Sequence, residues 1–305
     1  LPSLQRILFD TSELSNSDGT DNNAPLVTAT LPKDDYRTVH IAKILGLHNG
    51  DTLRAGTVRS PKEGDNNNQL AGLITDDATI TWLPEGKIRK AQPTKNGDPP
   101  GSLQIAFPHP PMTESVEISD VPPVSLLLAL PRPLQLGRIL PMVSQLGVDH
   151  LILTNAKKVP KDYFGSHIFR KPEVLRGLLV EGLAQSGDVR LPNVTVTKRL
   201  KIFMEDELDQ MFPPDEVLRV IAHPQRGKVE RVTRMTDVSF SSNVPRRIVV
   251  AVGPEGGWEE PYELDRFTRK GFQQITMGTR VLRSDVAVVS LLALAHEVCA
   301  TDTSS

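Results

Sequence analysis

The chain has 305 residues, of which 38% are hydrophobic and 24% charged, with 35 Lys and Arg against 37 Asp and Glu. This composition is typical of a globular protein of one or two domains and excludes a fibre, a disordered chain and a disulfide scaffold. The single cysteine, Cys299, can supply neither an internal disulfide nor a cysteine-rich metal site, and we predict no metal centre.

No apolar stretch reaches the roughly 18 to 20 residues that a helix needs to span a bilayer. The two longest, Val121–Leu130 and Val286–Ala295, have the length of core segments, so we predict no membrane span. The sequence begins with Leu1 rather than with methionine, which leaves open whether an address signal has been removed.

Residues 1–120 contain short β-type segments separated by turns. We predict strands at Leu26–Thr30, Thr52–Ala55, Gln69–Ile74 and Ser102–Phe107, and a short amphipathic helix at Asp35–Leu45. Several short strands with turn residues between them are typical of a small β-barrel. Pro- and Gly-rich segments follow, and the predicted domain boundary lies near Ser119–Pro123.

Beyond this boundary, strands alternate with helices. A continuous apolar strand at Val124–Leu130, a helix that Gly147 ends and a strand at Val148–Leu153 form one βαβ unit, which implies parallel pairing. Further helices are predicted at Pro172–Gln185, Met204–Met211, Glu260–Lys270 and Asp285–Ala300, and further strands at Val217–Ala222, Ile248–Val252 and Gln274–Met277. Residues 121–305 are therefore predicted to form an α/β domain.

Charge is unevenly distributed along the chain. Residues 131–201 carry 12 basic and 5 acidic side chains, whereas residues 1–120 carry 11 basic and 16 acidic ones. Such a basic segment is either a set of solvated helix faces or a footprint for RNA or phosphate, and both interpretations remain open.

Two glycine-bearing loops follow predicted parallel strands. Gly253–Gly257 follows the strand Ile248–Val252, and Met277–Arg283 follows the next one. Open α/β sheets bind ligands at the carboxyl ends of their strands, and glycines let the backbone approach a flat ligand closely. The spacing matches neither the dinucleotide nor the P-loop pattern, and a purely structural turn remains the alternative.

The last helix is apolar on every side over Val286–Ala295, and we expect it to be surrounded rather than to lie on a surface. Because it begins directly after the second loop, helix and loop are expected to form the floor of a ligand site or an oligomer interface.

The paired loops resemble a known signature. Val252–Trp258 (VGPEGGW), followed by Met277–Ala287 (MGTRVLRSDVA), is similar to the "GPEGG(F) … LGxRILRxETA" pair of the RsmE family. Shorter similarities lie at Ala222–Pro224, Gln185–Pro192 and His40–Leu53, so the resemblance covers both halves of the chain. The sequence departs from the pattern at Asp188, at Asp285–Val286 and over Ala156–Phe169.

The resemblance implies a SPOUT-type α/β domain with a trefoil knot at residues 121–305 and a PUA-like RNA-binding β-barrel at residues 1–120. It further implies a homodimer that uses S-adenosylmethionine to methylate N3 of a uridine in small-subunit ribosomal RNA. The departures suggest a divergent branch of the family. We expect a cytoplasmic protein, or one of an organellar stroma or matrix if the chain is eukaryotic.

The resemblance also assigns residues. The expected cofactor cradle consists of Ala222, His223, Gly253, Glu255, Gly256, Gly257, Met277, Gly278, Val281 and Leu282. Our hypothesis is that Arg283 and Arg190 hold a phosphate or a uracil oxygen and favour the anionic base. His223 and Glu255 are either bases or hydrogen-bonding structural residues, and Trp258 either stacks on a ligand or packs beneath the loop.

Two other classes of function compete with this one. In a noncatalytic RNA-binding assembly factor, the barrel and the basic segment work while the cofactor loops are relics, although both loops retain their glycines. A small-molecule enzyme on a nucleotide-binding fold leaves the β-barrel and the basic segment unused.

Overall fold

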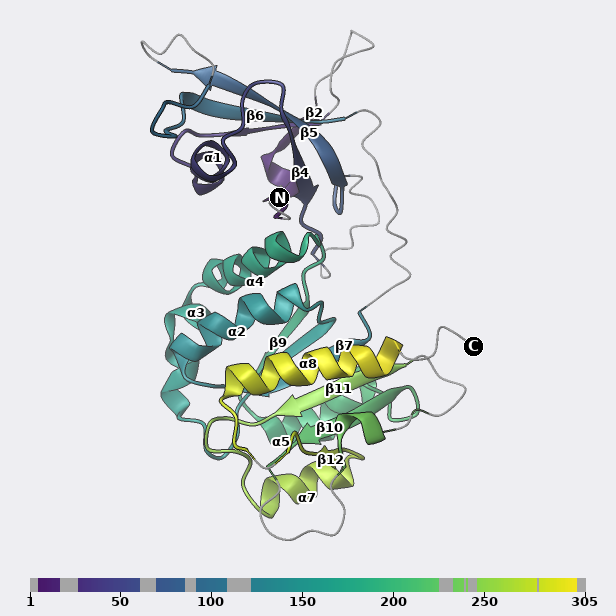
Figure 1. Cartoon of the computed structure of the whole chain (residues 1–305). Coiled ribbons are helices and arrows are strands. Elements are labelled where there is room, and N and C mark those ends of the chain that lie inside the picture. Colours follow the sequence, from purple (N-terminus) through teal and green to yellow (C-terminus); the bar gives the residue numbers. More distant parts are fainter. Residues whose placement is uncertain are drawn as a thin grey trace. The chain divides into compact units, whose positions relative to one another are not determined.

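The computed structural model describes residues 5–16, 27–60, 70–85, 92–108, 122–224, 233–238, 240, 246–278 and 280–300. The chain divides into two compact units (Figure 1). Unit 1 consists of Leu1–Ile118 and Leu183–Leu191, and unit 2 consists of Ser119–Gly182 and Pro192–Ser305. The predicted boundary at Ser119–Pro123 lies mostly outside the described residues.

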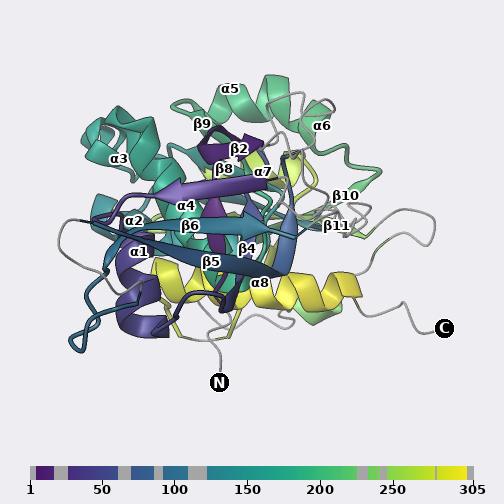
Figure 2. The same cartoon turned by 90° about the horizontal axis from the view of Figure 1, so that it is seen from above.

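Unit 1 contains a six-stranded sheet with the order β1-β4-β5-β6-β3-β2. Its strands are β1 (Ile7–Phe9), β2 (Leu14–Asn16), β3 (Val27–Leu31), β4 (Thr52–Thr57), β5 (Ile74–Pro84) and β6 (Gly101–Phe107). All neighbours pair antiparallel except β1 and β4, which are parallel. Figure 2 shows β3, β6 and β5 lying side by side.

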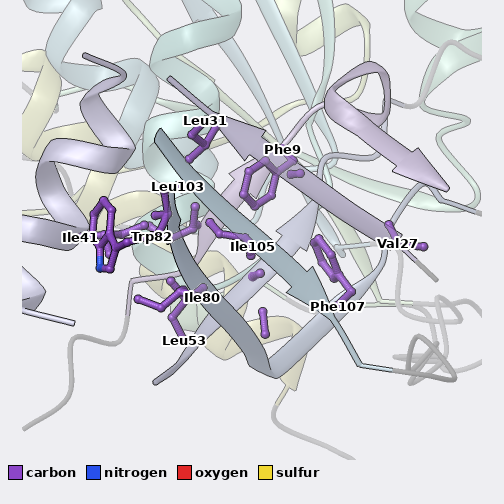
Figure 3. Packing of buried hydrophobic residues seen from close by; sticks show 14 of the residues in the cluster. Phe9, Val27, Leu31, Ile41, Leu53, Ile80, Trp82, Leu103, Ile105 and Phe107 are labelled. Atoms are coloured by element: carbon purple, nitrogen blue, oxygen red, sulfur yellow. The ribbon is translucent and has the colours of Figure 1, made fainter. Parts of the chain in front are cut away.

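The sheet of unit 1 curls around its own core. β1 and β6 are three strand positions apart, which in a flat sheet is roughly 14 Å. The rings of Phe9 on β1 and Phe107 on β6 nevertheless lie 6.0 Å apart, centroid to centroid. Figure 3 shows these rings with the buried side chains of Trp82 and Ile105 in the same cluster. Burial of this apolar surface is the main stabilising contribution to unit 1.

The predicted strand at Gln69–Ile74 is wrong. Leu70–Gly72 forms a turn, in which Gly72 has a φ of 78°, and β5 begins only at Ile74. The predicted helix at Asp35–Leu45 is present as α1 (Tyr36–His40), continued by the π-helical turn η2 (Ile41–Leu45). A 3-10 turn, η1 (Thr11–Glu13), connects β1 and β2.

The segment Leu183–Leu191 completes unit 1. The backbone N–H of Arg6 donates to the carbonyl of Ala184, and its guanidinium Nε donates to the carbonyl of Gly187 at 3.0 Å. The N–H of Arg59 donates to the carbonyl of Val189. Because Leu183, Val189 and Leu191 are also buried, this short segment is part of the structure of unit 1 although it is remote in sequence.

Unit 2 is built on a wholly parallel six-stranded sheet with the order β12-β10-β11-β7-β8-β9. Its strands are β7 (Val124–Ala129), β8 (His150–Thr154), β9 (Asn193–Thr197), β10 (Val217–Ala222), β11 (Arg247–Val252) and β12 (Gln273–Ile275). All six residues of β7 are buried, as expected for a central strand of a parallel sheet with both faces covered. The predicted α/β class is confirmed for unit 2, which differs from the predicted domain 121–305 because Leu183–Leu191 belongs to unit 1.

Helices cover this sheet. They are α2 (Pro133–Gln145), α3 (His167–Arg170), α4 (Pro172–Ser186), α5 (Leu200–Ile202), α6 (Leu208–Met211), α7 (Tyr262–Arg269) and α8 (Ser284–Ala300), with further helical turns η4 (Lys161–Gly165), η5 (Phe203–Glu207) and η6 (Met235–Asp237). α8 packs over β11 and β7 and beside α2 (Figure 1). Among the described residues, no helix combines the length and the apolar character that crossing a membrane requires.

The expectation that α8 is enclosed on every side is wrong for the single chain. Val288, Leu291, Leu292 and Ala295 are buried, but Val286 is 47% exposed and Leu294 36% exposed. The sheet, α2 and η6 pack against the helix, and among the described residues Val286 and Leu294 form an apolar strip that they leave exposed.

Candidate functional site

Three neighbouring strands of unit 2 place their following loops together. β10 lies between β11 and β12, and all three run parallel. Their carboxyl ends are therefore at the same edge of the sheet, where Ala222, Val252 and Ile275 lead into loops. The amino-terminal part of α8 follows the last of these loops.

A cavity lies among these loops. It is lined by Lys158, Ala222, His223, Pro224, Val252, Gly253, Pro254, Glu255, Gly256, Gly257, Trp258, Glu260, Ile275, Thr276, Met277, Gly278, Arg280, Val281, Leu282, Ser284, Ala287 and Leu291. The structure brings all ten residues of the predicted cradle together in this lining.

The first glycine loop rests on a buried aromatic cluster. Trp258 is 1% exposed, and its ring lies 4.7 Å from that of Phe267, centroid to centroid. A Cβ atom added at Gly253 would lie 3.2 Å from Nε1 of Trp258, which is closer than most Cβ contacts, so glycine lets the loop lie tightly on the indole. Packing beneath the loop, one of the two roles considered for Trp258, is what the structure shows.

Two residues that sequence analysis missed hold this loop to the segment after β8. The Lys158 ammonium donates to the carbonyls of Gly256 and Trp258, at 3.0 and 3.1 Å. The buried Glu263 carboxylate accepts from the backbone N–H groups of Lys157 and Glu259. Lys158 belongs to the segment that differs from the family pattern, so the motif gave no signal for it.

His223 lies at the edge of the cavity with one ring nitrogen paired. Its Nε2 is 2.7 Å from Oε1 of Glu260, another residue that the sequence did not indicate. The side chain of His223 is 9% exposed, and its Nδ1 has no hydrogen-bond partner among the described residues. The same holds for Nε1 of Trp258. Buried polar atoms without partners are uncommon, and both belong to residues that line the cavity.

The second loop is shaped by Gly278. Its φ of 107° is accessible to glycine and strained for other residues. The Thr276 hydroxyl donates to the carbonyl of this glycine at 3.1 Å and so stabilises the bend. Val281, further along the loop, is 72% exposed.

A second, basic cavity adjoins the first. It is lined by Arg132, Pro133, Leu134, Gln135, Arg138, Tyr163, Glu255, Val281, Leu282, Arg283 and Ser284, four of which also line the first cavity. Glu255 joins the two cavities structurally, because its carboxylate accepts the backbone N–H of Arg132 at 2.9 Å. A structural role for Glu255 as a hydrogen-bond acceptor is therefore present.

Arg283 lines this second cavity and is oriented by Asp285. Its guanidinium donates to both carboxylate oxygens, at 3.2 and 2.5 Å. Desolvation would raise the pKa of Asp285, but hydrogen bonds from Arg283, Gln135 and the Val286 N–H hold that pKa below its usual value. The carboxylate therefore remains charged and holds the exposed guanidinium at the mouth of the cavity.

Arg190, the second predicted catalytic residue, belongs to unit 1. Its backbone forms an isolated parallel bridge with Arg59, and its N–H donates to the side chain of Asp188. The pairing of Arg190 with Arg283 on one substrate stays a prediction.

The comparison with protein families decides the membership of this chain. A family model described as an RNA methyltransferase domain matches residues 119–296, which is more than half of the chain. The chain belongs to this family. The residues that match the family model include both glycine loops, the lining of the basic cavity and most of α8.

Curated relatives of this family member agree with the motif resemblance. "Ribosomal RNA small subunit methyltransferase E" of Treponema pallidum is 29% identical over 268 residues, which cover 87% of this chain and 84% of the relative. The Synechocystis protein of the same name is 28% identical over 185 residues, covering 58% of this chain and 54% of the relative. The resemblance to the RsmE family is thereby confirmed.

Solved structures share the fold. Ribosomal RNA small subunit methyltransferase E from Neisseria gonorrhoeae, bound to S-adenosylmethionine, aligns with a TM-score of 0.58 and 16% identity over 96% of this chain and 97% of the other. A Legionella pneumophila protein with bound S-adenosylmethionine aligns with a TM-score of 0.55 and 16% identity over 96% of each chain. At these identities, the comparison supports the fold alone.

Proposed function

We propose that the protein transfers the methyl group of S-adenosylmethionine to N3 of a uridine in small-subunit ribosomal RNA. The observation that carries the proposal is that the first cavity gathers all ten predicted cradle residues at the carboxyl ends of β10, β11 and β12. Membership in the RNA methyltransferase family and the names of the curated relatives support the same activity.

The lining of the first cavity fits the proposed cofactor. Its glycine loops expose backbone N–H and C=O groups, which can hydrogen-bond the edge of an adenine. Nε1 of Trp258 and Nδ1 of His223 have no hydrogen-bond partner among the described residues, so they offer the ligand one N–H donor and one further polar atom. The apolar side chains of Leu282, Ala287 and Leu291 can cover the flat ring. When bound, S-adenosylmethionine supplies a methyl group on a positively charged sulfur.

The basic cavity is the proposed place for the target nucleotide. Tyr163 offers a ring on which a base can stack, and Arg132 and Arg138 offer charges for phosphate. Arg283, held by Asp285, is proposed to donate to a uracil oxygen and to stabilise the anionic base that remains after the N3 proton has passed to solvent water. Arg190 is proposed to contribute a second guanidinium to the RNA. Alignment of two bound reactants in neighbouring cavities accounts for several kcal/mol of rate enhancement.

The architecture is part of the proposal. We assign the curled sheet of unit 1 to an RNA-binding barrel of the PUA type, and the loops leading to α8 to a trefoil knot. We also assign the exposed apolar strip of α8 to a homodimer interface, because Val286 and Leu294 would lose contact with water there. The motif resemblance supports these assignments.

The test uses the full chain, small-subunit ribosomal RNA and S-adenosylmethionine carrying an isotopically labelled methyl group. We expect 3-methyluridine in nucleoside digests analysed by mass spectrometry. Arg283→Ala should lower the single-turnover rate by roughly a hundredfold while cofactor binding is retained. Arg269→Ala, which changes an exposed arginine on α7 outside both cavities, should leave that rate unchanged.

Each other outcome has a defined meaning. A normal rate for Arg283→Ala removes this residue from the reaction. A labelled methyl group on another atom overturns the assignment to uridine N3. Cofactor binding without any transfer to RNA favours a noncatalytic assembly factor.

A further inference from the structure

The contact between His223 and Glu260 has no role in the function proposed so far. Glu260 lies in the loop after β11, and His223 directly follows β10. The side chain of Glu260 is 59% exposed, whereas that of His223 is 9% exposed. The backbone of His223 is fixed separately, because its N–H donates to the carbonyl of Ile275 at 3.1 Å. The backbone position of His223 therefore does not depend on Glu260, whereas the hydrogen bond of its ring does.

This hydrogen bond selects a tautomer. A carboxylate accepts hydrogen bonds and donates none, so at 2.7 Å Nε2 of His223 is the donor to Glu260. In a neutral imidazole the other nitrogen, Nδ1, then carries a lone pair. This atom is buried and has no partner among the described residues, although His223 lines the first cavity. It is available as an acceptor for an N–H or O–H group of a bound molecule.

The nucleoside part of the proposed ligand offers hydrogen-bond donors to Nδ1. Its adenine amino group and its ribose hydroxyls are donors that a lone pair can accept. The other charged side chains of the lining are Lys158, Glu255 and Arg280, and none of them has a hydrogen bond to the ring among the described contacts.

We propose that Glu260 is a positioning residue that holds His223 in the tautomer whose Nδ1 accepts a hydrogen bond from the nucleoside part of the cofactor. The inference rests on the proposed function for the identity of the ligand. The inference adds two residues from neighbouring loops to the proposed cofactor site. His223 accepts a hydrogen bond from a donor group of the nucleoside, not from the reacting methyl group, and Glu260 fixes the tautomer of His223.

The experiment measures binding of S-adenosylhomocysteine to the full chain by calorimetry. Glu260→Ala removes the acceptor for Nε2 and should weaken binding roughly tenfold. Glu260→Gln should restore most of the affinity, because its amide oxygen can accept the same N–H. Glu259→Gln, which neutralises the neighbouring carboxylate not bound to His223, should bind like the wild type.

A double-mutant cycle isolates the role of the tautomer. An asparagine at position 223 places its amide oxygen about where Nδ1 lies and needs no carboxylate to remain an acceptor. His223→Asn should therefore bind nearly as tightly as the wild type, and adding Glu260→Ala to it should cost less than twofold. His223→Ala should weaken binding roughly tenfold. Nitrogen-15 NMR of the free protein should show His223 protonated at Nε2 and not at Nδ1.

The failures can be told apart. No binding of S-adenosylhomocysteine to the wild type overturns the proposed function and, with it, the ligand assigned to Nδ1. Tight wild-type binding that Glu260→Ala leaves unchanged overturns only the role of Glu260. The tautomer mechanism is overturned if Glu260→Ala weakens binding equally in the wild type and in the His223→Asn variant. A proton on Nδ1 in the NMR spectrum also overturns it.

Discussion

Gly253 and Gly256 lie in the same loop but have different neighbours. A Cβ at Gly253 would lie 3.2 to 3.3 Å from three atoms of the Trp258 ring, which is buried against Phe267. A Cβ at Gly256 would lie 3.1 and 3.3 Å from the Cδ and Cβ of Lys158, an unbranched chain that can shift by a few tenths of an ångström more easily than a ring packed against Phe267. The loop therefore depends on glycine at position 253 for packing and much less so at position 256.

We predict that Gly253→Ala weakens S-adenosylhomocysteine binding and lowers the free energy of unfolding by about 1 to 3 kcal/mol, because the indole, which is packed against Phe267, must shift to accommodate the methyl group. Gly256→Ala should change the unfolding free energy by less than about 1 kcal/mol. Urea denaturation of both variants measures the difference. Equal losses at the two positions would contradict the packing argument.

At the scale of elements, α4 and α2 approach each other at Gly182. A Cβ at this position would lie 2.1 Å from the carbonyl oxygen of Pro141 on α2, which is backbone and cannot rotate away. Gly177 lies earlier on α4, and a Cβ there would meet nothing within 4 Å. One helix thus contains a glycine that the packing requires and one that it does not.

Gly182→Ala should separate α4 from α2, with a loss of about 3 kcal/mol or more in unfolding free energy or a loss of soluble protein. Gly177→Ala should stabilise the protein by up to about 1 kcal/mol, because alanine is the better helix former. Thermal unfolding followed by circular dichroism compares the two variants. Normal stability of Gly182→Ala would show that the helices can separate without cost.

The elements that the sequence predicted well are those with a strong local pattern. β7, β11 and α8 are long apolar runs, and α2 has a clear helical period with glycine at its end. β1 and β2 are only three residues long, and β9 alternates polar and apolar residues over only five positions. β5 was missed because a run of polar residues, Thr75 to Asp77, interrupts its apolar alternation. These strands form because the neighbouring strands offer hydrogen-bonding partners, which a local pattern does not reveal.

The residues of the candidate site could likewise be predicted where they belong to a local sequence motif, and not where they depend on contacts between distant segments. The glycine loops of the site are contiguous motifs and contain eight of the ten cradle residues, and Ala222 and His223 belong to a third short motif, so all ten could be named in advance. Lys158 and Glu260 act through hydrogen bonds to residues 98 to 100 and 37 positions away in the chain. Such partners depend on which strands are neighbours in the sheet, and this order becomes known only from the fold.

At the scale of the whole molecule, the exposed strip of α8 determines the expected assembly. Leu294 lies beyond the part of α8 that lines the first cavity, so a change there tests association without altering the site. We predict that the protein sediments at twice 33.5 kDa at micromolar concentration. Leu294→Lys should shift it to the monomer, because a charge would be desolvated in the interface.

Ile44→Lys is the matched control for this prediction. Ile44 is 71% exposed and lies in unit 1, outside the proposed interface, so this variant should sediment like the wild type. A wild-type protein that sediments only as a 33.5 kDa species would contradict the proposed homodimer.

The interleaving of the two units constrains synthesis and dissection. A nascent chain that has emerged only as far as Ile118 still lacks Leu183–Leu191, so Arg6 has neither the Ala184 nor the Gly187 carbonyl to bind. The core of unit 1 therefore stays incompletely covered until Ser119–Gly182 of unit 2 and then Leu183–Leu191 have left the ribosomal tunnel. For the same reason, a gene cut near codon 120 encodes two fragments, each of which lacks a partner segment that its own residues cannot replace.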